Sequence, residues 1–598
     1  MNFYFHSVIY NTMKEPPDPD DIDTSKFTAV KSTLNQFCNN DFIKQKLNQH
    51  VLNSNKLIFE VYKFANLHLL RCFRDNEALP ILDQSFFYKC SCYVSEMYLK
   101  KSQNNNTVSF DKTFDIYKLQ RPKDYKPAYR DNLGSIINYL DKQMVISTIN
   151  HLVLNFYKRF SRFIKDKYEL DNKTVYEICK AVYDKDYKGD ESKGLVNEIV
   201  KKYRTILDNK PPYEKFIKKD PSKILKIYNE ILTFNIQNNK RLFSLIPNKN
   251  GFTMNYINID KTGLKDILVS IKLANFKREH FDKHTKSYLN KFFHIQKFET
   301  INKKFHSFLT DGVSVSILLE KTNTDVVKSK LKEFTYKNEE LIALDPGLRM
   351  LFVGCNNQND TIIDCSGKSY YHDAGINRIN NKQKRHYNKD EDVLSYIRNM
   401  PIGKTNDITE FCKHLSYCLN KLDKVLEFHY KNPFRKWHFT KYILEKKKIN
   451  ELCQLISKKQ DINEQSKVIV GFGDWSNPHD SIIRGHKRGP VLKLKKHLRK
   501  WCKVIDVNEF RTSKLCCKCH NETEKISYNG VKVNSVLRCC NNECGMIIDR
   551  DINGCKNILK MLMVSLNQID KPEAFKRTNK SLPSLAQKAN VSAKVKTL

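Results

Sequence analysis

Two short-spaced cysteine pairs in the last hundred residues constrain the fold of this chain most strongly. The first pair is Cys516 and Cys519 in "TSKLCCKCH", and the second is Cys544 with either Cys539 or Cys540 in "LRCCNNECG". Two such pairs joined by about twenty residues are typical of a four-cysteine zinc site, because each pair forms a turn whose amides support the thiolates. The pattern predicts a zinc ribbon with one structural Zn²⁺, since four thiolates leave no open coordination position.

The zinc interpretation depends on the redox environment of the 18 cysteines. The opening "MNFYFHSVIYNTMKEPPDPDDID" lacks a basic region followed by a clean apolar run, so we expect no secretory signal. No stretch approaches the roughly 18 consecutive apolar residues that a membrane span needs, so we expect no membrane partner. A reducing compartment favours metal ligation over disulfides, and chance clustering in a cysteine-rich chain is the alternative.

The charge balance points to a polyanionic partner. The chain carries 104 Lys and Arg against 66 Asp and Glu, a formal net charge of +38. A phosphate backbone is the commonest partner for so much positive charge, although a compositional bias toward Lys and Asn gives the same balance. The segment 481–503 contains no acid, which favours phosphate contacts over a merely solvated helix face. Its candidate contact residues are Arg484, Lys487, Arg488, Lys493, Lys495, Lys496 and Arg499.

The hydrophobic pattern divides the 598 residues into several domains, as length alone suggests. Helical periodicity dominates 41–235, where Leu57, Val61, Phe64 and Leu67 form one stripe. The aromatic residues of this region could stack on bases, but most are expected in its core. A turn and an alternating strand in "TDGVSVSILL" indicate a small β-rich domain that follows.

A different pattern begins after Lys337 and indicates an α/β layer with a mixed sheet. Apolar runs separated by a Pro-Gly turn predict two strands, and helical patterns follow over 409–459. The expected strands lie in "LIALDPGLRMLFVG", "TIIDCSG", "KVIVGFGDWS" and "CKVIDVNEF", and a basic helix is expected in "GPVLKLKKHLRKW".

Two aspartates stand at positions where metal-dependent phosphodiester chemistry could use them. Asp345 ends the apolar run "LIAL", and Asp551 lies in "DRDIN" ahead of an apolar helix. Taken singly, the first is better explained as a turn residue and the second as a helix cap. Two-metal hydrolysis, however, needs carboxylates that converge on ions about 3.5–4 Å apart, and such ligands are often scattered in sequence.

The order of these features resembles a known family. A strand-end aspartate, further strands and helices, and a zinc ribbon running into "DRDINGCKNIL" are similar to the RuvC-like nuclease half of the transposon-encoded TnpB proteins and their eukaryotic relatives, the Fanzor proteins. The resemblance is specific from about Thr310 to Met561 and rests on architecture alone in the N-terminal half. The matching motifs are "LDPG", "TSKLCCKC", "CGMIIDRDINGCKNI" and, for Fanzor in particular, "TDGVSVS", "GDWS" and "EFRTS".

The resemblance implies roles for particular residues. Asp345 matches the first catalytic aspartate and Asp551 the last, with Asp549 as the runner-up for the last position. The ligands of the ribbon are matched by Cys516, Cys519, Cys544 and either Cys539 or Cys540.

The middle acid departs from the TnpB pattern, in which a Glu directly follows the strand that matches "KVIVGF". Fanzor proteins often use a Glu further along, which matches Glu509, and Asp474 is the alternative. In "VIDVNEF", Ile505, Val507 and Glu509 share one strand face. A carboxylate on such an apolar face must be paired, bound to metal or at an exposed strand end, which favours Glu509.

The fold class implied is a multidomain α+β protein with a helical recognition lobe, a small β-rich wedge domain and a RuvC/RNase H-like α/β nuclease domain with an inserted zinc ribbon. The expected segments are a flexible leader and the start of the wedge (1–40), the helical recognition domain (41–235), the wedge (236–326), the nuclease in two parts (338–511 and 547–570), the ribbon between them (512–546) and a basic tail (571–598).

The resemblance also implies a function. The protein would be an RNA-guided DNA endonuclease that uses two Mg²⁺ held by Asp345, Glu509 and Asp551, acting after a guide RNA pairs with target DNA and a short flanking motif is read. It would work as a monomeric ribonucleoprotein in the nucleus. The alternatives are an RNA-guided DNA-binding protein without cleavage, favoured by the displaced middle acid, and a guide-free zinc-ribbon DNA-binding factor.

Overall fold

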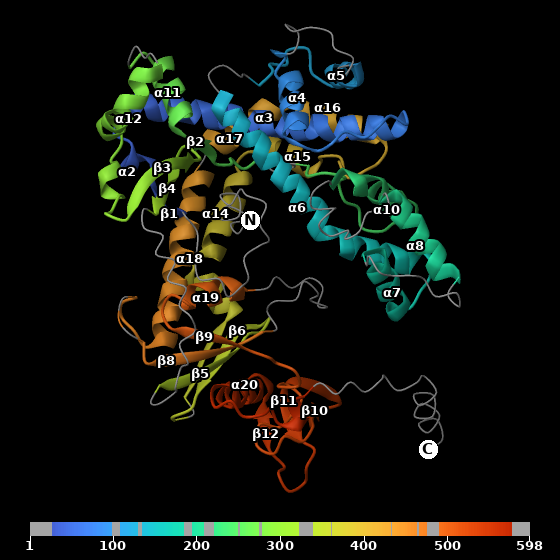
Figure 1. Ribbon diagram of the computed structural model, residues 1–598, viewed down its shortest axis with the longest axis vertical. Coiled ribbons are helices and arrows are strands. Elements are labelled where there is room, and N and C mark those ends of the chain that lie inside the picture. Colours follow the sequence, from blue (N-terminus) through green and yellow to red (C-terminus); the bar gives the residue numbers. More distant parts are fainter. Residues whose placement is uncertain are drawn as a thin grey trace. The chain divides into compact units, whose positions relative to one another are not determined.

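The chain divides into two compact units in the computed structural model (Figure 1). Unit 1 comprises Met1–Val327 and Arg385–His438, and unit 2 comprises Lys328–Lys384 and Phe439–Leu598. Among the described helices, none combines the length and apolar character needed to cross a lipid bilayer. The residues that the structure describes are 27–97, 108–128, 134–183, 194–207, 221–248, 252–273, 278–321, 339–359, 361–431, 433–462, 464, 466–474 and 489–576.

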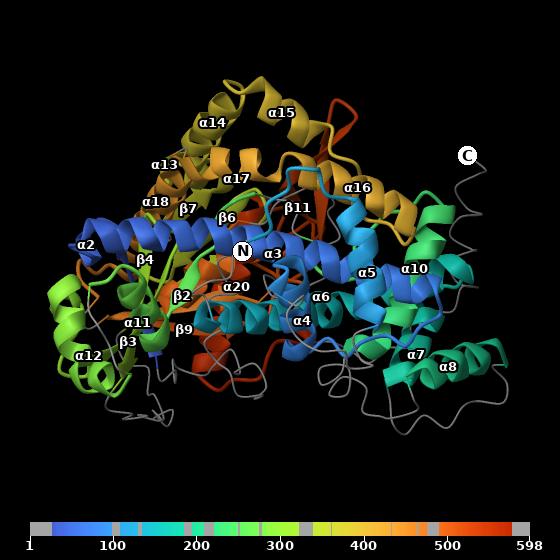
Figure 2. The same cartoon turned by 90° about the horizontal axis from the view of Figure 1, so that it is seen from above.

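Unit 1 is mostly helical and is built around the 34-residue helix α3 (Asp41–Arg74). Leu57, Val61, Phe64 and Leu67 are fully buried, which confirms the helical stripe predicted there. Helices α4, α5, α16 and α17 pack along α3 (Figure 2), so its second half is buried on all sides. The other helices of unit 1 are α2 (Leu34–Phe37), α4 (Gln84–Val94), α5 (Val108–Leu119), α6 (Gly134–Lys167), α7 (Asn172–Tyr183), α8 (Gly194–Ile206), α10 (Leu225–Gln237), α11 (Lys261–Ser270), α12 (Arg278–Phe292), α15 (Glu391–Arg398), α16 (Ile408–Asn420) and α17 (Leu422–Lys431), with 3₁₀ turns at Pro221–Ile224 and Ile295–Lys297.

Aromatic side chains fill much of the core around α3. The ring of Phe64 contacts those of Tyr93, Phe110, Phe114 and Tyr117, at centroid distances of 5.8, 6.2, 6.5 and 5.5 Å. All five residues are buried. These rings therefore stabilise the helical unit and are not displayed for stacking on bases, as expected for most aromatic residues of this region.

The segment Arg385–His438 belongs to unit 1, although the predicted segments place it within 338–511. Helices α16 and α17 bury one face each, including Leu415 and Val425, in the same hydrophobic cluster as α3. Helical periodicity shows that such faces are buried, but not which distant helix covers them. The domain boundary therefore differs from the one drawn on sequence pattern.

A four-stranded antiparallel sheet completes unit 1, in the order β1-β4-β3-β2. Strand β1 (Phe27–Thr33), from the segment expected to hold the leader and the start of the wedge, pairs with β4 (Ser314–Lys321) along its whole length. Strands β3 (Lys303–Thr310) and β2 (Ile257–Ile259) follow. The turn in "TDGVSVS" brings Gly312 to φ +85°, a left-handed conformation that favours glycine.

The centre of unit 2 is a five-stranded mixed sheet in the order β7-β6-β5-β8-β9. Strands β5, β8 and β9 are parallel, whereas β6 and β7 run antiparallel to their neighbours. This arrangement agrees with the α/β layer expected from the sequence. The strands are β5 (Glu340–Asp345), β6 (Met350–Asn356), β7 (Ile362–Ser366), β8 (Val468–Gly473) and β9 (Lys503–Val507).

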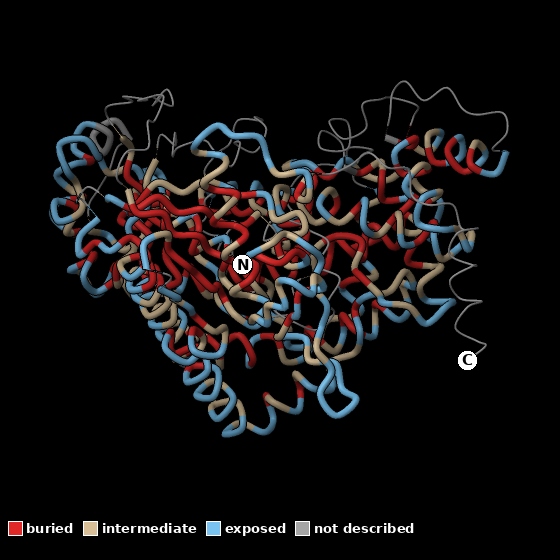
Figure 3. Tube along the Cα trace, turned by 90° about the horizontal axis from the view of Figure 1, so that it is seen from below, coloured by how far each residue is buried: buried red, intermediate tan, exposed pale blue. Residues whose placement is uncertain are grey.

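Both faces of this sheet are covered. Leu341 and Ala343 of β5 lie in a hydrophobic cluster with the C-terminal helix α20 (Arg550–Leu566), whereas Ile342 and Leu344 lie in the cluster on the opposite face. The central strands are accordingly buried along nearly their whole length. Figure 3 draws buried residues of the chain in red. Near-continuous apolar runs such as "VIVGF" are typical of strands covered on two sides.

The remaining elements of unit 2 flank the sheet or form the ribbon. A three-stranded antiparallel sheet in the order β10-β11-β12 is inserted between β9 and α20. Helices α14 and α18 each contain a boundary between the two units. The elements are α13 (Gly367–Asp373), α14 (Ile376–Tyr387), α18 (Phe434–Ser457), α19 (Val491–Leu498), β10 (Thr523–Tyr528), β11 (Val531–Cys539), β12 (Ile547–Asp549) and a 3₁₀ turn at Glu573–Phe575.

Candidate functional site

The parallel strands of unit 2 place three candidate acids at one edge of the sheet. Strand β5 ends at Asp345, β8 is followed directly by Asp474, and Glu509 comes two residues after the end of β9. Carboxyl ends of neighbouring parallel strands meet at the same edge, where open α/β sheets commonly bind their ligands. Residues more than 160 positions apart in sequence are therefore gathered by strand pairing alone.

The last acid, Asp551, lies in the first turn of helix α20 (Figure 1), close enough to Asp345 for its charge to act on that carboxylate. The helix packs on β5 and β6, and its Gly554 faces Asp345. A Cβ at Gly554 would clash with Asp345 Oδ2 and lie 3.3 Å from Asp345 Cγ. The first carboxylate is therefore in contact with the N-terminal turns of α20, where the helix dipole favours a negative charge.

Burial and a neighbouring negative charge raise the pKa of both aspartates. Loss of solvation, followed by the charge of Asp551, raises the pKa of Asp345 to about 7, and Arg550 opposes the shift. Loss of solvation, followed by the charge of Asp549, raises the pKa of Asp551, and Arg550 and Arg349 oppose it. Because both carboxyl groups are harder to ionise than a free aspartate, the site has too little positive charge to balance two carboxylates. A bound divalent cation would supply that charge.

Glu509 extends toward the turn that follows Asp345. A Cβ at Gly473 would lie 2.6 Å from Glu509 Cδ and 2.9 Å from Cδ of Pro346, so that the Glu509 carboxylate and Pro346 both approach Gly473. Glycine at position 473 leaves the space that the carboxylate occupies. The structure thus places Glu509 beside the residue that directly follows Asp345.

Asp474, the alternative middle acid, makes backbone contacts that hold the ends of β8 and β9 together. Its N–H donates to the carbonyl of Val507 (3.0 Å), and its Oδ1 accepts a hydrogen bond from the N–H of Glu509 (3.2 Å). One oxygen of Asp474 is therefore used to anchor Glu509. This arrangement favours Glu509 as the acid that faces the site.

Asp549, the runner-up for the last acid, is the N-cap of α20. Its Oδ1 accepts hydrogen bonds from the N–H groups of Asp551 (2.9 Å) and Ile552 (3.2 Å). Asp549 therefore caps the helix, a role that the sequence taken alone suggested for Asp551. The carboxylate of Asp551 accepts no hydrogen bond from the residues that the structure describes.

The acids do not form a binding site for a single ion. In the described part of the chain, the four-cysteine cluster is the one group of three or more Cys, His, Asp or Glu side chains whose ligand atoms all lie within 4.8 Å of one another. A pair of ions about 3.5–4 Å apart accepts more widely spaced carboxylates, because each acid need reach only one ion. The shortage of positive charge and the oxygen donors fit a pair of hard divalent ions.

The cysteine cluster consists of Cys516, Cys519, Cys539 and Cys544. The Sγ atoms of Cys516 and Cys544 are 3.8 Å apart, and those of Cys519 and Cys539 are 3.3 Å apart. Tetrahedral zinc with Zn–S bonds of about 2.3 Å requires sulfur atoms about 3.8 Å apart, so the cluster fits Zn²⁺. Cys540 is exposed and lies outside the cluster, so the structure assigns the second pair to Cys539 and Cys544.

Each cysteine pair is followed by a residue in the left-handed region. His520 has φ +61° directly after Cys519, and Gly545 has φ +50° directly after Cys544. In the first turn the N–H of Lys518 donates to Cys516 Sγ (3.4 Å), the amide-to-thiolate contact expected of a zinc ribbon. A backbone hydrogen bond from Asn521 lowers the pKa of Cys519, whereas loss of solvation raises the pKa of Cys539.

The predicted phosphate contacts of α19 are mostly engaged within the protein. Lys493 pairs with Glu445 (2.8 Å), and Arg499 lies 3.4 Å from Asp506. Lys495 is 5% exposed and pairs with Asp506 (2.7 Å), so the prediction of a phosphate contact is corrected there. The acids that neutralise these side chains come from α18 and β9, outside the acid-free run that suggested unopposed charge. Lys496 is exposed, whereas Arg484, Lys487 and Arg488 lie outside the described residues.

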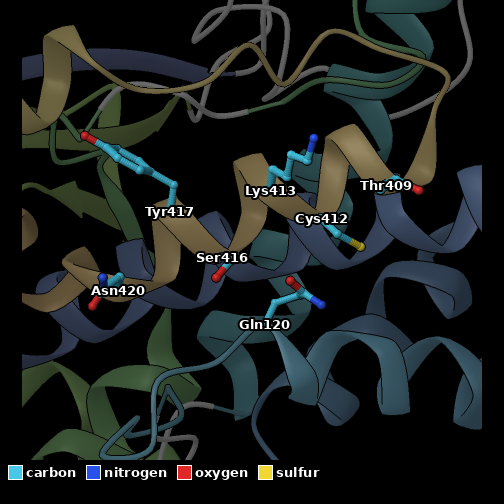
Figure 4. Close-up of a pocket in the computed structure, with 7 residues that line it drawn as sticks. All are labelled: Gln120, Thr409, Cys412, Lys413, Ser416, Tyr417 and Asn420. Atoms are coloured by element: carbon cyan, nitrogen blue, oxygen red, sulfur yellow. The ribbon is translucent and has the colours of Figure 1, made fainter.

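A pocket of about 550 Å³ lies in unit 1 (Figure 4). It is lined by one face of α16, including Cys412, Lys413 and Ser416, and by Gln120 just beyond α5. The Nζ of Lys413 is already paired with Glu410 (2.7 Å). None of the candidate acids or zinc ligands lines this pocket.

Sequence reasoning missed three residues that shape the acid site. Gly554 permits the close approach of Asp345, and Arg349 and Arg550 set the charge around Asp551. An isolated glycine in a helical pattern is a signal of close packing, and "DRDINGCKN" contains one. Arg349 follows the Pro-Gly turn and carries no comparable signal in the sequence.

Comparisons with known proteins match the region of the ribbon. Residues 493–558 match the family model described as "Cas12f1-like, TNB domain", a segment that runs from α19 through the zinc ribbon into α20. A comparison with curated proteins gives no match. Similar solved structures include a Cas12f1–sgRNA–target DNA complex (10% identity, TM-score 0.27, covering 90% of this chain and 99% of that chain) and CasPhi-2 (Cas12j) bound to crRNA (14% identity, TM-score 0.24, covering 46% and 56%). The chain thus spans little more than half of CasPhi-2, and the matched family segment holds Glu509, the four cysteines and Asp551.

Proposed function

We propose that this protein is an RNA-guided DNA endonuclease of the Fanzor type. The observation that carries the proposal is that Asp345 and Asp551, 206 positions apart in the sequence, lie near each other at the carboxyl edge of a parallel strand group, where burial and a neighbouring carboxylate raise the pKa of each. Glu509 lies beside the residue that follows Asp345. The match of 493–558 to a Cas12f1-like domain and the net charge of +38 support the same function.

In this proposal the three acids bind two Mg²⁺. Bound magnesium supplies the Lewis acidity that activates water and stabilises the leaving oxygen of a phosphodiester. Asp345 is fixed by β5 and Gly554, Glu509 by its N–H bond to Asp474, and Asp551 by the capped first turn of α20. Arg349 and Arg550 lie near Asp551 and would meet the DNA backbone.

The partners are proposed by the same reasoning. The related solved structures are described as complexes with crRNA or with sgRNA and target DNA. A guide RNA would pair with one DNA strand, and the protein would hold the duplex through its backbone and read a short flanking motif. The zinc ribbon would be structural, the particle a monomeric ribonucleoprotein, and its site of action the nucleus.

The test begins with the RNA that co-purifies with the protein. We expect a defined RNA whose variable end, paired with a matching DNA duplex, directs cleavage in Mg²⁺ and not in EDTA. Asp345→Ala should abolish cleavage, whereas Asp364→Ala, an exposed aspartate on strand β7 of the same sheet, should not.

Two outcomes would replace the proposal. If the wild type and Asp345→Ala are equally inactive but both still bind DNA in a guide-dependent way, the protein would be an RNA-guided binding protein. The displacement of the middle acid to Glu509 favours this second candidate. DNA binding without any defined RNA would indicate a guide-free factor.

A further inference from the structure

Two asparagines of α20, Asn553 and Asn557, are completely buried at 0% exposure. Asparagine is seldom fully buried, because its amide must find hydrogen-bond partners inside the protein. The two residues are one helical turn apart and therefore lie on the same face of α20.

Both side chains bind the backbone that leads into the zinc ribbon. Asn553 Oδ1 accepts a hydrogen bond from the N–H of Cys517 (2.8 Å), and Asn553 Nδ2 donates to the carbonyl of Leu515 (2.8 Å). Asn557 Nδ2 donates to the carbonyls of Leu515 and Thr512, both at 2.8 Å. Cys517 lies between the ligands Cys516 and Cys519. The hydrogen bond from its N–H therefore connects Asn553 to the backbone of the first zinc turn.

The same backbone segment begins at the middle acid. The N–H and Oγ1 of Thr512 both donate to the carbonyl of Glu509, at 3.2 and 3.0 Å. Thr512 is 1% exposed, and its own carbonyl is the acceptor for Asn557. A continuous chain of hydrogen bonds therefore runs from Glu509 through Thr512 to α20, and onward from α20 to the zinc turn.

Lys560 continues the contact one turn further along α20. Its Nζ donates to the carbonyl of Cys517 and lies 3.2 Å from His520 Nε2. The zinc turn is thus held through its N–H by Asn553 and through its carbonyl by Lys560. Together with the asparagines, these bonds leave the segment 509–520 little freedom to slide along the helix.

We propose that Asn553 and Asn557 are positioning residues that fix the zinc turn and Glu509 against the helix that carries Asp551. The inference deepens the proposed nuclease function and rests on it for its catalytic consequence. Zinc binding then also affects the acid site, because the amide of Asn553 binds the turn that zinc orders. The backbone that follows the middle acid is thereby hydrogen-bonded to the helix that carries the last one.

The test uses three variants of α20. Asn553→Ala removes the bond to the zinc turn, and Asn557→Ala is the milder change, because Leu515 and Thr512 keep bonds from Asn553. Asn567→Ala is the matched control, an exposed asparagine at the C-cap of the same helix. Each purified protein is compared with the wild type in zinc binding, hydrogen exchange, DNA binding and cleavage.

The first readouts need no catalytic activity. Competition with a chromogenic zinc chelator should show about 10–100-fold weaker zinc binding for Asn553→Ala, the range typical when a group that orients a metal ligand is removed. Hydrogen exchange should quicken in peptides covering 512–519. Unchanged zinc affinity and unchanged exchange in both asparagine variants would overturn the proposal.

The catalytic readouts separate positioning from a general loss of structure. We expect the cleavage rate at saturating DNA to fall about 100-fold in Asn553→Ala, because small displacements of reacting groups have effects of that size. The Mg²⁺ concentration at half-maximal rate should rise, while the Kd for target DNA changes less than threefold. A variant that folds and cleaves with wild-type Mg²⁺ dependence would refute the positioning role. A wild type that never cleaves would refute only the proposed function, since the zinc and exchange measurements stand independently.

Discussion

Replacing Asp345 by Asn should stabilise the metal-free protein, although it removes a proposed catalytic acid. The substitution keeps the shape of the side chain and removes the charge that burial and Asp551 disfavour. The pKa of Asp345 is raised from 3.8 to about 7, which at about 1.36 kcal/mol per unit corresponds to roughly 4 kcal/mol of unfavourable ionisation above pH 7. Because the side chain is partly exposed, solvent screening reduces the expected gain to about 1–2 kcal/mol.

The sign of the pH dependence follows from the same shift. Near pH 4 the carboxyl group is largely protonated in the folded chain and the charge costs little. As pH rises from about 4 to 7, the unfolded chain ionises Asp345 before the folded chain does, so the wild type loses stability relative to Asp345→Asn. The advantage of the variant should be complete above pH 7 and vanish toward pH 4.

The measurement is thermal unfolding of both proteins between pH 5 and pH 8. Each protein keeps its bound zinc, and the buffer contains neither Mg²⁺ nor EDTA. At pH 8 the transition that reports unit 2 should be about 2–8 °C higher in the variant. Added Mg²⁺ should raise the transition of the wild type and leave that of the variant nearly unchanged, because bound ligands stabilise only the state that binds them. A variant that is less stable than the wild type at pH 8, or a difference independent of pH, would refute the reasoning.

Five further substitutions test the rest of the site. Glu509→Gln should lower Mg²⁺-dependent cleavage by at least about 100-fold with DNA binding retained, whereas Asp474→Asn should lower it by about tenfold or less. Both rates are measured in a single-turnover assay, and the reverse order would exchange the roles of the two acids. Gly554→Ala should lower cleavage about 10–100-fold, because the added Cβ displaces the carboxylate of Asp345. This loss is expected although alanine normally stabilises a helix by about 0.5–1 kcal/mol relative to glycine. Unaltered cleavage would contradict the close contact between Gly554 and Asp345. Cys516→Ser should lose bound zinc and lower the melting temperature, whereas Cys540→Ser should retain one zinc per chain by elemental analysis, and zinc loss in the second variant would contradict the ligand assignment.

Local patterns predicted those parts of the fold that depend on neighbouring residues. The buried run "VIVGF" and the Pro-Gly turn after Asp345 mark strands of the mixed sheet because burial on two faces requires continuous apolar sequence. The cysteine spacing indicated the ribbon, since two ligands on one turn must be close in sequence.

Features that depend on residues far away in the chain could not be predicted from the sequence. The choice between Cys539 and Cys540 rests on which of two successive residues at the end of β11 faces inward, and that follows from the register with β10. The charge of Lys495 is neutralised by Asp506, which approaches only because β9 and α19 pack together. The assignment of Arg385–His438 to unit 1 likewise depends on α3, more than 300 residues earlier.

The central place of β5 has a consequence for synthesis of the chain. Its parallel partner β8 begins at Val468, and the helix that covers its other face begins at Arg550. A ribosome that has made only the first 500 residues has therefore produced a sheet with an uncovered face and an incomplete set of acids. Any polypeptide that stops short of α20, through a nonsense codon or proteolysis, lacks both Asp551 and the helix that covers β5, so we expect it to have neither a closed hydrophobic core in unit 2 nor the complete set of acids.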